Sequence, residues 1–328
     1  MRYTSNMRKR IGPIAATLVG LIGLPLLVFT QRMAIYDWAR LYNYSPATEI
    51  IGLADRTTMS ASSRRLFYVY HPVIQQKADF NISCREDEHT IVLGCYVSGK
   101  GIYLLDITDP RLEGIEEVTA AHEMLHAAYE RLSGPEKRRV NGLLNDALRQ
   151  IKNDRILETV DLYRKQDASS VDNELHSILG TEVRELPEAL EQHYARYFSD
   201  RAKVVGFSEQ YERAFTERRD KIAAYDAELA SLKAQIDETQ ANLEKMLENL
   251  TSQRAALEAY RSSGNIDAYN AGVPAFNRQV SRYNALIDEM ARLVSSYNDI
   301  VSKRNALASE EQDLVKAIDS RETVPEKQ

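Results

Sequence analysis

The chain has 328 residues, of which 44% are hydrophobic and 27% charged, and its formal net charge at pH 7 is −6. This length suggests about two domains, and the apolar share supports a buried core and excludes wholesale disorder. The acidic balance argues against nucleic-acid binding, which usually needs a basic surface. With two cysteines and six histidines, a four-cysteine zinc site is excluded, and any metal site must use His, Asp and Glu.

Residues 11–30 carry no charge and are predicted to form a transmembrane helix. About 20 apolar residues are enough to cross the hydrocarbon core of a bilayer. The preceding residues 1–10 contain three arginines and one lysine and no acidic residue, so we expect them to form a cytoplasmic tail. A cleaved signal peptide has a shorter apolar run that ends at small residues, so an uncleaved anchor is favoured. The expected localisation is a single-pass membrane protein whose bulk is extracytoplasmic.

A connector at 31–65 is expected to lead into an α+β domain at 66–205. Three stretches rich in β-branched and aromatic residues are predicted strands, at 66–74, 90–97 and 101–107. Five helices are expected to follow them, near 113–132, 135–152, 155–166, 171–186 and 188–199. Cys84 and Cys95 flank a charged segment between two predicted strands. A disulfide across this hairpin is expected in an oxidising compartment.

The residues at 206–320 follow the heptad pattern of a coiled coil. Apolar residues recur at steps of three and four from Tyr211 to Tyr260, and again from Phe276 to Val301. A break rich in Ser, Gly and Pro separates the two runs, which predicts an antiparallel hairpin of two long helices. A polar tail at 321–328 ends the chain. Four asparagines of the second run are spaced at multiples of seven, and they either fix the register of the helices or form a solvated column: Asn277, Asn284, Asn298 and Asn305.

The sequence His122-Glu123-Met124-Leu125-His126 carries the strongest chemical signal. Two histidines four residues apart lie on one face of a helix and can bind a single Zn²⁺ ion. Glu123 can then act as the general base on a zinc-activated water molecule. The residues from Thr119 to Tyr129 are uncharged apart from Glu123 and the two histidines, as expected for a helix packed inside a domain.

Through this motif and the order of strands and helices around it, the chain resembles the zincin metallopeptidases. The resemblance implies a zincin-like domain with a small antiparallel sheet and helices. It also implies that a peptide substrate adds as a strand to a sheet edge beside the cleft. Either the strand at 90–97 or the strand at 101–107 fits that edge.

A catalytic zinc ion needs a third protein ligand and an open position for water. Asn173-Glu174 followed by Ser177 is similar to the second motif of gluzincins, a zincin subgroup, and this resemblance assigns the third ligand to Glu174. Glu182 and His176 lie nearby and remain alternatives, since both residue types bind zinc. For the second donor to the transition-state oxyanion, the candidates are His193, Tyr194 and Tyr197.

The sequence therefore predicts a membrane-anchored extracytoplasmic zinc metallopeptidase. A peptide or protein would be its substrate, and the coiled coil would bind a partner or drive self-association. A cell-wall peptide amide is a second possible substrate. The alternative from another class is an envelope scaffold that works through its coiled coil and carries a structural or vestigial zinc site.

Overall fold

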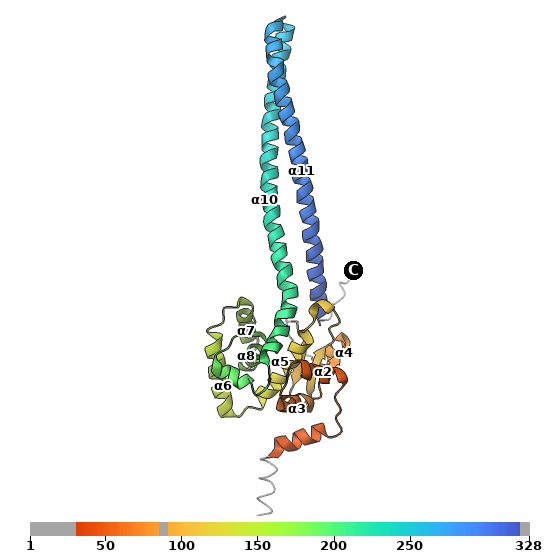
Figure 1. Ribbon diagram of the computed structural model, residues 1–328, viewed down its shortest axis with the longest axis vertical. Helices are drawn as coiled ribbons and strands as arrows, with labels where there is room; N and C mark the ends of the chain where they lie inside the picture. Colours follow the sequence, from red (N-terminus) through yellow and green to blue (C-terminus); the bar gives the residue numbers. More distant parts are fainter. Residues whose placement is uncertain (1–30, 85–90, 322–328) are drawn as a thin grey trace, which may run out of the picture. The chain divides into compact units, whose positions relative to one another are not determined.

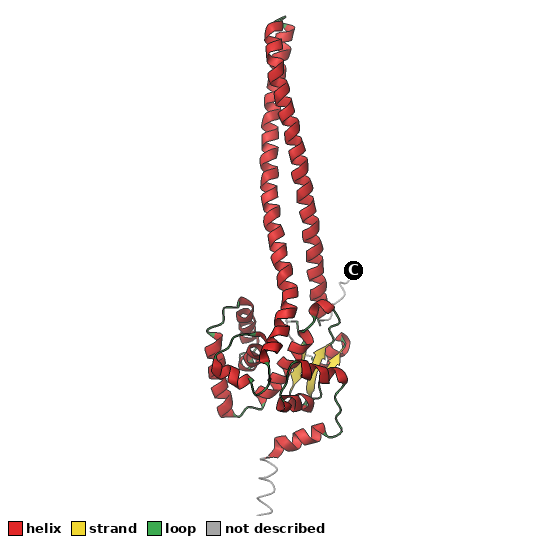
Figure 2. Cartoon of the chain, in the orientation of Figure 1, coloured by secondary structure: helices red, strands yellow, loops and turns green. Residues whose placement is uncertain are grey.

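A computed structural model describes residues 31–84 and 91–321. The chain divides into two compact units: one contains the residues up to Glu212 together with those from Ala317 onward, and the other is Arg213–Lys316. Most described residues are helical, and the three strands form a single small sheet (Figures 1 and 2).

The first unit consists mainly of short helices. A helix covers residues 31–41 and precedes the others. The remaining elements, in chain order, are α2 (Thr48–Arg56), α3 (Ala61–Val69), β1 (Val73–Gln75), α4 (Lys77–Ser83), β2 (Gly94–Val97), β3 (Gly101–Leu105), the 3₁₀ turn η1 (Pro110–Leu112), α5 (Ile115–Glu130), α6 (Gly134–Leu148), α7 (Asp154–Gln166), α8 (Val171–Glu182) and α9 (Glu188–Tyr194). The long helix α10 (Arg201–Ser262) begins in this unit and continues into the second.

Helix α5 lies at the centre of the first unit. It packs against α2, α3, α8 and the strands β2 and β3. Its middle residues are buried on all sides, which explains why the sequence there is uncharged apart from Glu123 and the histidines. Gly114 caps the helix N-terminus with a φ of 98°, a conformation that only glycine adopts without strain.

The sheet has the strand order β1-β3-β2, so β2 is an edge strand and β3 is central. β2 and β3 follow each other in the chain and pair antiparallel, with Cys95 opposite Tyr103. β1 pairs with β3 in parallel, and α4 and β2 form the connection between them in the chain.

The expectation of an α+β zincin-like fold with an antiparallel sheet is therefore wrong. The molecule is predominantly helical and its small sheet is mixed. In the first predicted strand, at 66–74, residues 66–69 belong to α3 and only 73–74 belong to a strand, β1. Ser60 caps α3 by accepting a hydrogen bond from the backbone N–H of Ser63, and Phe67 is buried on its inner face.

Among residues 31–84 and 91–321, no helix is long and apolar enough to cross a membrane. The predicted span at 11–30 and the cytoplasmic tail at 1–10 lie outside these residues. The part of the chain that the structure describes therefore does not support the expected single-pass membrane localisation.

The predicted disulfide is confirmed: Cys84 is bonded to Cys95. The predicted hairpin around it is not formed, because Cys84 follows helix α4 rather than a strand. The bond therefore ties the end of α4 to the edge strand β2.

The second unit is an antiparallel pair of helices, the C-terminal part of α10 and most of α11 (Ile266–Ile318). A three-residue turn joins the helices, and Gly264 adopts a φ of 74° there. The break is shorter than the sequence pattern predicts, because α11 continues through Pro274. The least exposed positions recur at steps of three and four in both helices, as in a coiled coil.

Candidate metal centre

His122, Glu123 and His126 lie on the central helix α5. The four-residue spacing puts both imidazoles on one face, with ring centroids 4.7 Å apart. One ligand atom from each of the three residues lies within 4.8 Å of the other two. Glu123 is only 5% exposed, yet its side chain lines a cleft.

The carboxylate of Glu174, on helix α8, lies beside the two histidines. Its two carboxylate oxygens lie 3.7 Å from His122 Nε2 and 3.6 Å from His126 Nε2. The two helices approach closely because α8 contains Gly180. A Cβ atom at Gly180 would lie 2.4 Å from Leu125 Cδ1, so a larger residue would push α8 away from α5.

The other two candidates for the third ligand are engaged elsewhere. Glu182 lines the cleft but accepts a hydrogen bond of 2.7 Å from Arg155 Nη2, and Arg155 also pairs with Glu212. His176 is fully buried, and its Nε2 lies 2.9 Å from His193 Nε2. The geometry therefore favours Glu174 as the partner of the two histidines.

The charges at this cluster are strongly coupled. Burial opposes the protonation of His122, but the carboxylates of Glu174 and Glu123 outweigh it and raise its pKa to about 9. Burial lowers the pKa of His126 to about 4. Burial tends to raise the pKa of Glu174, but His126 and His122, helped by a hydrogen bond from Tyr163, lower it overall. Glu174 therefore stays ionised, and a metal ion bound here would displace the proton of His122.

The donor set fits a zinc ion. Two ligands that each lie about 2.1 Å from a tetrahedral zinc ion are about 3.4 Å apart, close to the 3.6 and 3.7 Å between Glu174 and the histidines. Glu174 Oε2 is buried and has no hydrogen-bond partner in the part of the chain that the structure describes. An unpaired buried carboxylate oxygen is costly, and a metal ion would satisfy it.

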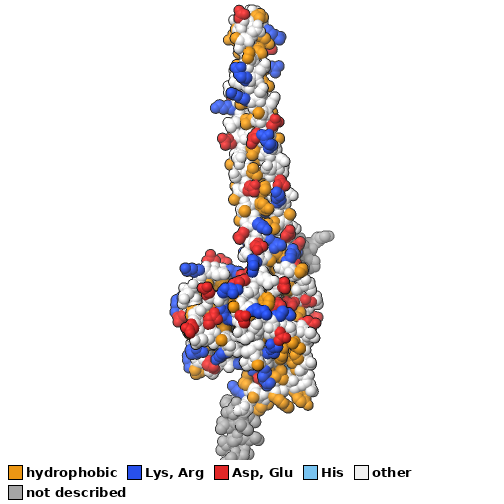
Figure 3. Space-filling model, in the orientation of Figure 1, with side chains coloured by type: hydrophobic (Ala, Val, Ile, Leu, Met, Phe, Trp, Pro, Cys, Tyr) orange, Lys and Arg blue, Asp and Glu red, His pale blue; other side chains and the backbone are white. Residues whose placement is uncertain are grey.

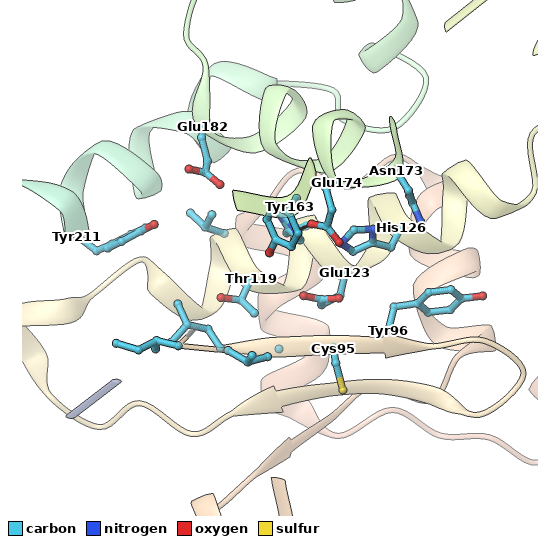
Figure 4. Close-up of a pocket in the computed structure, with 16 residues that line it drawn as sticks. Cys95, Tyr96, Thr119, Glu123, His126, Tyr163, Asn173, Glu174, Glu182 and Tyr211 are labelled. Atoms are coloured by element: carbon cyan, nitrogen blue, oxygen red, sulfur yellow. Dashed lines mark ion pairs between the residues drawn. The ribbon is translucent and has the colours of Figure 1, made fainter. Parts of the chain in front are cut away.

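The cluster lies in a cleft with a volume of about 350 Å³ (Figure 4). Residues 91–96, which include the edge strand β2, line one wall, and α5, α7, α8 and α10 contribute the others. Gly94 faces Glu123: a Cβ atom there would lie 3.1 Å from Glu123 Cγ and 2.5 Å from Thr119 Cγ2. Only glycine lets the strand lie this close to α5.

Two tyrosines in the cleft were missed by the sequence analysis. Tyr163 comes from α7, and Tyr211 comes from α10, where the heptad pattern had placed it in the coiled coil. Burial raises the pKa of Tyr211, which keeps its hydroxyl protonated and able to donate. Neither belongs to a recognisable motif, and only the tertiary fold brings them to the cleft.

The predicted oxyanion donors lie outside the residues that line the cleft. Tyr194 is fully buried and donates a hydrogen bond of 2.7 Å to the carbonyl oxygen of His176. Tyr197 and His193 pack edge to face, with ring centroids 5.3 Å apart. All three residues contact His176 of α8, which indicates a role in packing.

Compared with known proteins, the chain matches no protein-family model, no curated protein sequence and no solved structure at a significant level. Its function has to be inferred from the site itself.

Proposed function

We propose that the chain is a zinc-dependent peptidase that hydrolyses peptide bonds. His122, His126 and Glu174 would hold the metal ion, and Glu123 would act as the general base. The proposal rests on one observation above all: donors from two helices converge beside a buried glutamate in an open cleft. A purely structural zinc site is usually closed by four protein ligands and needs no such glutamate.

When bound, zinc would supply a Lewis acid that activates a water molecule and polarises the scissile carbonyl. Glu123 would accept the proton of the attacking water and deliver it to the leaving amine.

The edge strand β2 offers a binding site for an extended peptide. One side of β2 pairs with β3, and the residues from Ile91 to Tyr96 border the cleft. A substrate added to this edge as a further strand would be held by main-chain hydrogen bonds, so its backbone would lie along the cleft. The hydroxyl of Tyr211 replaces the donors expected from sequence as a candidate to stabilise the oxyanion.

The test is hydrolysis of a mixture of quenched fluorescent peptides by the zinc-loaded full chain. Glu123→Gln keeps the shape of the side chain but removes the base, so we expect it to retain zinc and to lose roughly 10²–10⁴-fold in rate. Glu158→Gln, an exposed position on α7, is the matched control and should cleave like wild type. Equal rates for Glu123→Gln and wild type, or no cleavage of any peptide by zinc-loaded wild type, would rule the proposal out.

A further inference from the structure

The helix α11 carries a second heptad pattern beside the one that packs against α10. Each of its positions lies one residue after a position of the hairpin interface, about 100° further around the helix. We call these residues the second seam: Asn277, Val280, Asn284, Ile287, Ala291, Val294, Asn298, Val301, Asn305, Ala308, Gln312 and Val315.

The second seam is uncharged along its whole length, and its steps alternate between three and four residues. Such a pattern is the mark of a helix face that packs against another helix. The other faces of α11 carry charged residues, such as Arg282 and Asp299, and the hairpin interface itself includes Arg304 and Glu311, so the second seam is the longer uncharged face.

Most of this face is exposed in the second unit, although Val280, Val301 and Ala308 are partly buried. Ile287 is 43% exposed and Val294 is 40% exposed, although both are large and apolar. The four asparagines are exposed as well, so they do not fix the register of the hairpin, which was one of their two predicted roles. Figure 3 shows hydrophobic side chains at the surface of the hairpin among charges of both signs.

We propose that the second seam binds the same seam of a second copy of this chain, with the two α11 helices parallel and in register. In that arrangement each residue meets its own equivalent. A side-chain amide has both a donor and an acceptor, so asparagine pairs well with asparagine, and valine packs on valine. In an antiparallel pair each asparagine would face a valine, isoleucine or alanine and leave its amide unpaired.

The residues that flank the second seam also suit a second copy. In a parallel pair of helices, a flanking residue contacts the residue five positions later in its partner. Glu311 would then meet Lys316, the one such pair with charges on both members, and the charges are opposite. Most other flanking positions on one side are small and neutral: Ser281, Ser295, Ser302 and Ser309.

Disulfide trapping in the full chain tests the contact and its direction. The two native cysteines are bonded to each other, so an introduced cysteine is the one free thiol. We expect Val280→Cys and Val294→Cys each to form a disulfide-linked dimer on mild oxidation, on the order of ten-fold faster than Ala285→Cys. Ala285 is exposed on another face of α11 and is the matched control.

Sedimentation equilibrium supplies an independent measure. We expect wild type to sediment with twice the chain mass of 37.3 kDa. The double variant Ile287→Lys/Val294→Lys should sediment as a monomer, whereas Ala285→Lys/Ala306→Lys, which adds the same charge elsewhere, should remain a dimer. Circular dichroism checks that the helices persist in every variant.

Three results would overturn the proposal. The first is trapping at Val294 no faster than at Ala285. The second is trapping at Val294 without trapping at Val280, which an antiparallel pair would give. The third is a wild-type chain that sediments as a monomer.

Discussion

At the scale of single residues, the candidate metal centre combines a local pattern with one long-range contact. His122, Glu123 and His126 are neighbours on one turn of α5, so helical spacing alone predicts their arrangement. Glu174 is distant in sequence and reaches them only because α8 packs on α5. Sequence could suggest this ligand through its resemblance to a motif, but could not exclude Glu182, whose bond to Arg155 depends on the fold.

The buried pair His176–His193 leads to a prediction about stability. Burial, together with the nearby Arg196 and Arg139, lowers the pKa of His193 to about 4. Its unfolded value is about 6.5, so between pH 6.5 and 4 the unfolded chain binds a proton that the folded chain does not. Stability should therefore fall as the pH drops through this window, by up to about 3 kcal/mol for this group.

His193→Gln removes the titrating group and keeps a hydrogen-bonding amide. We expect its stability to depend less steeply on pH between 6.5 and 4 than that of wild type. Denaturant unfolding followed by near-ultraviolet circular dichroism, which senses the buried tyrosines around the pair, measures this. Part of the slope should remain, because burial also lowers the pKa of His176. Identical slopes in the two proteins would show that His193 does not titrate as described.

At the scale of elements, the contact between β2 and α5 sets the width of the cleft. The disulfide from Cys84 to Cys95 ties β2 to the end of α4, and Gly94 lets the strand approach Glu123. A displacement of β2 would shift the proposed peptide-binding edge relative to the base without touching a metal ligand.

Gly94→Ala should therefore change how the substrate lies in the cleft without changing metal binding. The added methyl group would lie 2.5 Å from Thr119 Cγ2 and would push β2 away from α5. We expect kcat/KM to fall roughly 10–100-fold while the zinc content stays at the wild-type level. Gly142→Ala on α6 is the control, because a Cβ there meets nothing within 4 Å. Wild-type activity in Gly94→Ala would mean that the strand does not align the substrate.

Element types in the helical part of the chain could be predicted better than those around the strands. The five helices after residue 113 begin within two residues of where capping residues and periodicity indicate, as with Ser133 and Glu136 at the start of α6. Three of them, α6, α8 and α9, end four or five residues earlier than predicted. The run at 66–74 was read as a strand because its residues are aromatic and β-branched. Its first four residues, 66–69, belong to α3 because Ser60 caps that helix and Phe67 fits the core, whereas 73–74 belong to β1. In the helical part, tertiary packing overrides propensity.

At the scale of the whole molecule, the two units differ in how far their structure follows from local sequence patterns. The hairpin has a strict heptad repeat, so its helices and their pairing could be predicted, and so could the two alternatives for its asparagines. The first unit depends on contacts between distant segments. The parallel pairing of β1 with β3 and the arrival of Tyr163 and Tyr211 in the cleft leave no periodic signal. The grouping of His122, Glu123 and His126 could therefore be predicted better than the fold around them.

The most direct test of the proposed metal centre is the zinc content of the purified full chain, measured by mass spectrometry after zinc loading and removal of excess metal. We expect about one zinc ion per chain in wild type and in Glu182→Ala, and almost none in Glu174→Ala, because three protein ligands are needed for a stable catalytic site. Full zinc content in Glu174→Ala, or none in folded wild type, would contradict the assignment of His122, His126 and Glu174 as the metal ligands.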